Sequence, residues 1–195
     1  YGMGASLNNI GGVYYNKSDY DKALDYFERS LAIDEEIGDK RGIGASLGNI
    51  GVVYSDKGDY GKTLVYYERS LAIREEIGDK YGMGASLNNI GLVYANKGDI
   101  DTALDYYGRS LAIKEELGDK YGMGMSLNNI GVVYSNKGDY KKAEEYLDKS
   151  LAIRNEIGLG AEYLIVTTTI LFLSYKNLKK SYNVTEIHTL IKETE

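Results

Sequence analysis

The segment ASLNNIGGVYYNKSDYDKALDYFERSLAI (5–33) recurs three more times in this sequence, and each copy begins 40 residues after the one before it. The copies at 45–73, 85–113 and 125–153 align with the first one without a gap. A fixed period of roughly 20–50 residues is typical of solenoid proteins, in which stacked repeats bury a shared core. The repeat therefore predicts a solenoid.

Each repeat is expected to contain two helices. Leu7, Ile10, Gly11 and Tyr14 follow the i, i+3, i+4, i+7 spacing of one helical face, and the later copies keep this pattern. The helix ends are predicted at Ser18, Gly58, Gly98 and Gly138 and at Gly38, Gly78 and Gly118, with Asp19, Asp39, Asp59, Asp79, Asp99, Asp119 and Asp139 as N-caps. The short connections make neighbouring helices antiparallel.

A glycine lies inside the first helix of every repeat, at the position of Gly11. Glycine inside a helix costs about 1 kcal/mol relative to alanine. Since all four repeats keep it, we expect a shared packing reason, namely that a neighbouring helix approaches the backbone there.

The order of these residues resembles the tetratricopeptide repeat, whose signature is a large residue, Leu-Gly, Tyr, Ala and an aromatic residue. The matching residues in the first unit are Leu7, Ile10-Gly11, Tyr14, Ala23 and Phe27. Ser30 stands where the family prefers alanine, no proline closes a unit, and the period is 40 residues instead of roughly 34. The longer unit is similar to the repeats of kinesin light chains, of Leu-Gly-Asn-repeat spindle-orientation adaptors and of bacterial signalling proteins.

The resemblance implies an all-α fold, an α-solenoid of antiparallel helix pairs wound into a right-handed superhelix. We expect four units, at residues 1–40, 41–80, 81–120 and 121–158. Residues 159–195 break the period and are predicted to form a degenerate helical cap, as terminal repeats often do. No such cap precedes the first unit, so we expect either earlier repeats there or a contact with another molecule.

The composition excludes several classes of function. The chain has 195 residues, a net charge of −6, one histidine and no cysteine. The acidic balance argues against nucleic-acid binding, which needs a basic face. The longest apolar run, residues 163–175, is shorter than the roughly 20 residues that span a bilayer. The lack of cysteine suits a reducing compartment, and we expect a cytoplasmic location.

No residue set predicts catalysis, so we expect neither an enzyme nor a bound cofactor or metal. The one histidine, His188, lies in the irregular tail. The paired glutamates, such as Glu35-Glu36, repeat with the unit, which is typical of a solvated helix face. The Gly2/Gly4 pair and its repeats lack the third glycine and the preceding strand of a dinucleotide site.

The side of the first helix opposite Leu7 and Gly11 is the candidate binding surface. In the families that this chain resembles, that side lines a concave groove. Its asparagine columns are interrupted by Gly48 and Asp56, and a varied strip runs beside them. The candidate groove residues are Asn8, Asn9, Tyr15, Asn16, Asn49, Val52, Asn88, Asn89, Leu92, Asn96, Asn128, Asn129, Val132 and Asn136.

An asparagine side chain offers two donors and one acceptor oxygen, so an asparagine ladder can pair with the backbone of an extended peptide. The alternative is that these side chains cap turns or bond to one another between helices. The columns contain no lysine or arginine, and we therefore expect no clamp for the terminal carboxylate of chaperones. Residues 1–40 contain eight acidic and four basic side chains, which would steer a basic partner segment to that end.

These observations predict a protein–protein interaction scaffold that binds an extended or helical peptide segment in its concave groove. We expect it to be part of a larger signalling or adaptor protein. The alternative is a structural module that self-associates by stacking through its uncapped N-terminal end.

Overall fold

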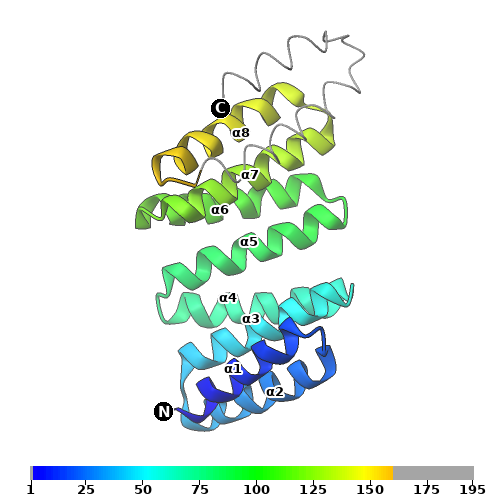
Figure 1. Cartoon of the computed structure of the whole chain (residues 1–195), viewed down its shortest axis with the longest axis vertical. Helices are drawn as coiled ribbons and strands as arrows, with labels where there is room; N and C mark the ends of the chain where they lie inside the picture. Colours follow the sequence, from blue (N-terminus) through cyan, green and yellow to red (C-terminus); the bar gives the residue numbers. More distant parts are fainter. Residues whose placement is uncertain (1, 160–195) are drawn as a thin grey trace.

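The structure is a computed structural model that describes residues 2–159, and this part of the chain consists of helices without strands (Figure 1). In chain order the helices are α1 Met3–Asn16, α2 Tyr20–Ile37, α3 Lys40–Asp56, α4 Tyr60–Glu76, α5 Lys80–Asn96, α6 Ile100–Leu117, α7 Lys120–Lys137 and α8 Tyr140–Glu156. The predicted all-α solenoid is confirmed. The predicted C-terminal cap from residue 160 onward, the apolar run at 163–175 and His188 lie outside the described residues.

The ends of the helices follow from local sequence. Each helix from α2 to α8 begins after an aspartate whose side chain accepts a hydrogen bond from the backbone N–H three residues later. Asp59, for example, accepts from the N–H of Lys62 at 3.0 Å, which gives a partner to a donor that has none within the helix. Each connection contains one residue with positive φ, a glycine such as Gly58 (φ 75°) everywhere except at Ser18 (φ 58°). The predicted caps and helix ends are confirmed.

The helices stack in a zigzag in which each helix packs against the next one in the chain (Figure 1). The first helices of successive pairs also touch, α1 with α3, α3 with α5 and α5 with α7. Within residues 2–159 the backbones of α2 and α4, of α4 and α6, and of α6 and α8 do not approach each other in this way. Because neighbours approach more closely on the inside of a curved stack, α1, α3, α5 and α7 line the inner side. We call this surface the inner face.

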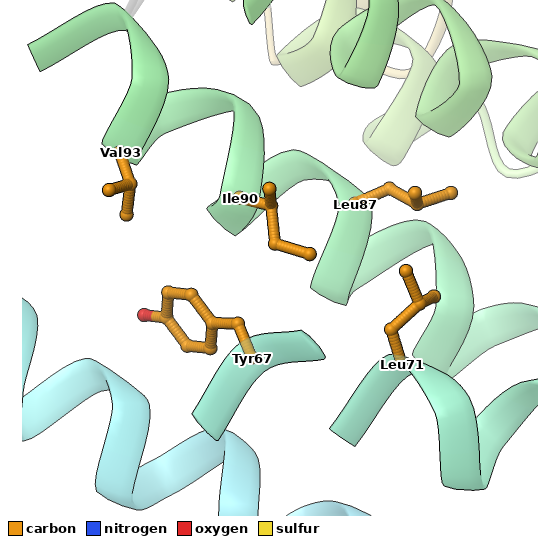
Figure 2. Packing of buried hydrophobic residues seen from close by; sticks show 5 residues of the cluster. All are labelled: Tyr67, Leu71, Leu87, Ile90 and Val93. Carbon is orange, nitrogen blue, oxygen red and sulfur yellow. The ribbon is translucent and has the colours of Figure 1, made fainter. Parts of the chain in front are cut away.

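The core lies between successive helix pairs. Figure 2 shows Tyr67 and Leu71 of α4 packed against Leu87, Ile90 and Val93 of α5, and each of the five is at most 8% exposed. Fully burying a side chain of this size contributes roughly 1.5–3 kcal/mol. Similar clusters lie between α2 and α3 and between α6 and α7. The stability of the array is therefore spread along it, through contacts between neighbouring units.

The repeated glycine of the first helix has the packing reason that the sequence suggests. A Cβ atom on Gly51 would lie 2.5 Å from the ring of Tyr67 in α4, which is far inside van der Waals contact. Gly11 faces Phe27 in the same way, at 2.6 Å. The approaching group is a large side chain of the paired second helix, where the expectation was a neighbouring helix in general.

The buried side of the first helix is wider than the sequence pattern predicts. In α3 both Ile50 and Val53 are fully buried against α2, although Val53 is outside the predicted stripe. The first unit differs, because no described helix precedes α1, and Ile10 and Val13 are 39% and 52% exposed. The tyrosine of the stripe is half-buried: the ring of Tyr54 stacks on that of Tyr66 with 5.5 Å between centroids.

A buried serine joins the two helices of each pair. The hydroxyl of Ser70 donates to the backbone oxygen of Gly44 at 2.7 Å, and Ser70 is fully buried. The same bond is formed by Ser30, Ser110 and Ser150. A buried hydroxyl is destabilising unless it has a partner. The bond therefore explains why serine is tolerated at the position where the family prefers alanine.

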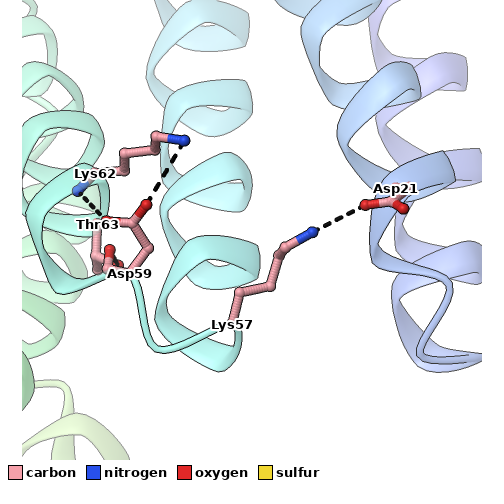
Figure 3. A network of polar contacts seen from close by, with 5 residues as sticks. All are labelled: Asp21, Lys57, Asp59, Lys62 and Thr63. Carbon is pink, nitrogen blue, oxygen red and sulfur yellow. Dashed lines mark hydrogen bonds and ion pairs between the residues drawn. The ribbon is translucent and has the colours of Figure 1, made fainter.

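Exposed ion pairs bridge neighbouring units (Figure 3). Nζ of Lys57, just after α3, lies 2.9 Å from Oδ1 of Asp21 in α2. Lys137 and Asp101 repeat this pair at 2.9 Å between the third and fourth units. Position 61, which corresponds to Asp21, is a glycine, so Lys97 has no equivalent carboxylate. Exposed pairs of this kind contribute about 0–1 kcal/mol each.

Candidate functional site

The asparagines predicted for the groove lie on the first helices and differ in exposure. Asn88 is buried, at 8% exposed. The half-buried ones are Asn8, Asn49, Asn89, Asn128 and Asn129, and the exposed ones are Asn9, Asn16, Asn96 and Asn136. Buried polar groups in proteins are almost always hydrogen-bonded. The partners of the less exposed asparagines therefore decide what this surface can offer to a ligand.

Two of the three junctions between units are joined by a pair of asparagines. Nδ2 of Asn49 donates to Oδ1 of Asn8 at 3.2 Å, and Nδ2 of Asn129 donates to Oδ1 of Asn88 at 3.0 Å. Nδ2 of Asn8 also donates to the hydroxyl of Ser46 at 2.8 Å. These amides bond to one another between helices, as the alternative interpretation of the sequence has it. Part of the asparagine ladder is therefore hydrogen-bonded within the protein.

Gly48 interrupts this pairing at the junction of the second and third units. Asn89 occupies the position that corresponds to Asn49 and Asn129, but residue 48 has no side chain to accept its amide. The polar column of the inner face consists of Asn8, Gly48, Asn88 and Asn128. It therefore has one gap, at Gly48, which lies between the two asparagine pairs.

The varied strip lies beside the asparagines. Val52 and Val132 are half-buried, whereas Leu92 is 44% exposed. Tyr15 is half-buried and its hydroxyl donates to Oδ2 of Asp56 at 2.6 Å. This hydrogen bond to a carboxylate raises the pKa of Tyr15 to about 12, so the phenol stays protonated in neutral solution. Tyr15 and Asp56 thus form a fixed polar contact between the first two units.

Two hollows bring several predicted residues together on the inner face. The first has a volume of about 410 Å³ and is lined by Asn8, Asn9, Asn49 and Asp34, among others. The second has a volume of about 230 Å³. Its lining includes Gly48, Asn49, Val52, Arg74, Ser86 and Asn89. The other predicted site residues line neither of these hollows: they are Tyr15, Asn16, Asn88, Leu92, Asn96, Asn128, Asn129, Val132 and Asn136.

Charged side chains of the second helices lie against the first helices, beneath the inner face. They occupy one repeated position, with Asp34 in α2, Arg74 in α4, Lys114 in α6 and Arg154 in α8. Asp34, Lys114 and Arg154 are buried, and Arg74 is half-buried. The first-helix columns contain no lysine or arginine, as the sequence shows, and the prediction from those columns did not include these second-helix residues. The visible signal was the charge in LAID, LAIR, LAIK and LAIR, one residue after the shared isoleucine.

Burial shifts the pKa values of three of these groups. Loss of water around its carboxylate raises the pKa of Asp34, although hydrogen bonds from Ser30 and Ser46 act in the opposite direction. Burial lowers the pKa of Arg74 and of Lys114. The negative charge of Asp79 acts to raise the pKa of Arg74, and that of Asp119 acts to raise the pKa of Lys114. No carboxylate of the described residues lies within 4 Å of either cation. Lys114 instead donates to Ser126 at 3.1 Å.

Two further features are absent from residues 2–159. No group of three or more metal-ligating side chains could hold a metal ion there. None of the described helices combines the length and the apolar character that crossing a membrane needs.

The family comparison decides the classification. The family model described as tetratricopeptide repeat matches residues 2–76 and 82–156. The chain belongs to the tetratricopeptide repeat family. No curated protein matches the sequence at a significant level.

Solved structures show the same tetratricopeptide repeat fold at low sequence identity. BtubC (BKLC) from P. vanneervenii is 23% identical with a TM-score of 0.72, over 80% of this chain and 64% of that one. A Rap protein complexed with competence and sporulation factor is 19% identical with a TM-score of 0.76, over 96% and 56%. A P. anserina putative kinesin light chain with nearly identical repeats is 16% identical with a TM-score of 0.73, over 96% and 91%. This chain thus spans less than two thirds of the first two proteins.

Proposed function

We propose that this tetratricopeptide repeat array is a protein–protein interaction scaffold that holds an extended or helical segment of another protein along its inner face. The observation that carries the proposal is the pair of neighbouring hollows, of about 410 and 230 Å³, along α1, α3 and α5. Both are lined by asparagine side chains of the first helices. Concave sites that combine apolar walls with a few polar groups are common ligand sites.

The chemistry of the inner face suits the backbone of a peptide. Asn9 is exposed and Asn89 lacks the asparagine partner that its counterparts have, so both amides are available to peptide N–H and C=O groups. Val52 and Leu92 lie on the adjoining strip and can pack against side chains of the bound segment. An amide that pairs with the backbone gives affinity without fixing the sequence, whereas the strip gives selectivity.

The similar Rap structure supports the proposal by analogy, because that protein is complexed with competence and sporulation factor. We further propose that the array is part of a larger signalling or adaptor protein; BtubC and the Rap protein both extend beyond the part that this chain matches. The acidic excess of residues 1–40 favours partners whose basic residues lie over the first unit.

The test is a selection of random peptides displayed on phage against the purified chain. Asn9→Ala with Asn89→Ala is the informative variant, since neither change removes a bond between helices. We expect the selected peptides to bind this variant about tenfold more weakly, as loss of one or two hydrogen bonds would give. Glu28→Ala with Glu68→Ala, both on exposed positions of the second helices, is the matched control. Equal affinity for all three proteins would contradict the inner-face assignment.

A second candidate function is self-association through the N-terminal end. Ile10 and Val13 of α1 are exposed, although the same positions are at most 5% exposed in α3, α5 and α7. A second copy could cover these side chains by stacking on the end of the array. Light scattering over a range of concentrations tests this: a rising mass that Ile10→Ser with Val13→Ser abolishes supports stacking, and a constant monomer mass excludes it.

A further inference from the structure

The gap in the polar column exposes a cation to the inner face. A Cβ atom on Gly48 would meet Nη2 of Arg74 and Oγ of Ser70, each at 3.6 Å. At the corresponding places, Asn8 and Asn88 have side chains that are engaged with Ser46 and Asn129. Since residue 48 has no side chain, nothing from this position covers the guanidinium of Arg74.

Arg74 has hydrogen-bonding capacity that the protein does not use. Its Nη2 donates to the backbone oxygen of Gly44 at 3.3 Å, and its Nε is buried without a partner. A guanidinium carries five N–H donors in a planar fork that matches a carboxylate. Asp79 lies on the Nη1 side of Arg74, but no ion pair within 4 Å forms between them. A buried donor without a partner is destabilising, so the internal hydrogen bonds of Arg74 do not fully compensate for its burial.

The second hollow lies over this group. Gly48, Arg74 and Asn89 all line its volume of about 230 Å³, together with Ser86. Asn89 has a free amide for the same reason that Arg74 is uncovered, because residue 48 lacks a side chain. One missing side chain therefore leaves a cation and an amide donor facing the same small space.

We propose that this hollow binds the side-chain carboxylate of an aspartate or glutamate in the bound segment, with Arg74 as the ion-pair partner and Asn89 as a second donor. The inference rests on the proposed function and adds the chemistry of one ligand residue. A side chain is favoured over a terminal carboxylate because the inner face continues on both sides of the hollow, along α1 and along α5 and α7, so a segment can pass through.

The neighbouring junctions differ in charge, and this fixes the register of the bound segment. At the first junction the residue equivalent to Arg74 is Asp34, which lines the first hollow together with Asp39 and Arg41. A carboxylate in the place of the cation disfavours an acidic ligand residue there. At the third junction Lys114 donates to Ser126, and the Asn88–Asn129 pair is formed above it. The acidic residue of the ligand is therefore expected over the second junction and not over the first.

The experiment compares three proteins in the phage selection, with the displayed peptides fused at their C-termini so that none has a free carboxyl terminus. Gly48→Asn restores the column, and its Cβ meets no atom closer than 3.6 Å, so the fold tolerates it. Gly48→Ala removes the glycine but leaves the hollow largely open, which makes it the matched control. An unfolding midpoint no lower than that of the wild type verifies the fold of each variant.

We expect the wild type and Gly48→Ala to select peptides with an aspartate or glutamate at one fixed position, and Gly48→Asn to select peptides without it. For a selected peptide, replacing that residue by its amide should weaken binding to the wild type about tenfold and leave binding to Gly48→Asn nearly unchanged. Arg74→Gln should behave like Gly48→Asn. Synthetic peptides with free and with amidated C-termini should bind equally.

The outcomes separate the inference from the function on which it rests. Selected peptides without an acidic preference, or the same preference in Gly48→Asn, overturn the inference and leave the scaffold function standing. Binding that depends on a free terminus overturns the side-chain assignment. If no protein selects any peptide, the proposed function fails, and nuclear magnetic resonance with N-acetyl-glutamate amide decides the inference. A shift of the Arg74 Nε–H signal in the wild type, absent with Gly48→Asn and with N-acetyl-glutamine amide, supports it, and no shift overturns it.

Discussion

Oδ1 of Asn88 in α5 accepts a hydrogen bond from Nδ2 of Asn129 in α7 at 3.0 Å, which ties the third unit of the array to the fourth. Asn88 is 8% exposed, so water cannot readily replace this donor. Asn129→Ala should therefore lower the free energy of unfolding by about 1–2 kcal/mol, because it leaves a buried acceptor without a partner. Urea denaturation followed by circular dichroism measures the change.

Asn89→Ala is the control for this prediction. Asn89 occupies the same helix position one unit earlier, but Gly48 gives it no asparagine partner. Its replacement should change the free energy of unfolding by less than about 0.5 kcal/mol. Equal losses for the two variants would show that the Asn88–Asn129 bond contributes nothing to stability.

The packing of Tyr67 over Gly51 predicts a clear difference between glycines of the first helices. A Cβ atom on Gly51 would lie 2.5 Å from the tyrosine ring, so Gly51→Ala should destabilise the array by about 1–3 kcal/mol through overpacking. A Cβ atom on Gly12 meets nothing within 4 Å. Gly12→Ala should therefore stabilise the array by up to about 1 kcal/mol, as alanine favours a helix over glycine. Thermal unfolding of both variants checks the opposite signs.

The burial of Asp34 predicts a dependence of stability on pH. Burial raises the pKa of this carboxyl, so the folded protein binds its proton more tightly than the unfolded chain does. The stability due to this group is fully present below the ordinary pKa of aspartate and is lost as the pH rises through the raised pKa. Asp34→Asn keeps an acceptor oxygen for Ser30 and Ser46 and removes this loss.

We therefore expect Asp34→Asn to be more stable than the wild type at neutral pH, with a difference that shrinks as the solution becomes acidic. Unfolding midpoints in urea, measured from acidic to neutral pH, test the sign. Glu68→Gln changes an exposed carboxylate on α4 and is the control. Its difference in stability from the wild type should not shrink as the solution becomes acidic. An advantage of Asp34→Asn that grows toward low pH would contradict the assignment.

The second junction also lacks an ion pair that the other two have. Lys57 and Lys137 each lie 2.9 Å from an aspartate of the preceding second helix, but position 61 is glycine. Gly61→Asp should give Lys97 the same partner and stabilise the array by about 0–1 kcal/mol through the pair, with a further gain from removing a helical glycine. Gly61→Ala measures the second contribution alone. The excess of the first variant over the second should fall in high salt, and an excess that salt leaves unchanged would exclude an ion pair.

The sequence by itself determined the elements of this protein and their order. An aspartate cap such as Asp59 acts on the N–H of Lys62, three residues away, and a glycine such as Gly58 acts on its own backbone. These interactions lie within one turn of the chain, so the sequence shows them directly. The 40-residue period then indicated the stacking of the helix pairs, since one pair cannot bury its apolar side alone.

Only the tertiary structure decided which side chains meet between units. Asn49 bonds to Asn8 across 41 residues, and Arg74 of a second helix lies beneath Gly48 of a first helix. Neither relation appears in the helical face of one unit, because each depends on how two stacked helices are offset and turned relative to one another. Ile10 shows the same limit: it occupies the same repeat position as Ile50, and it is exposed because no described helix covers it. Local bonds form within a single element, whereas burial and pairing require the partner element to be in place.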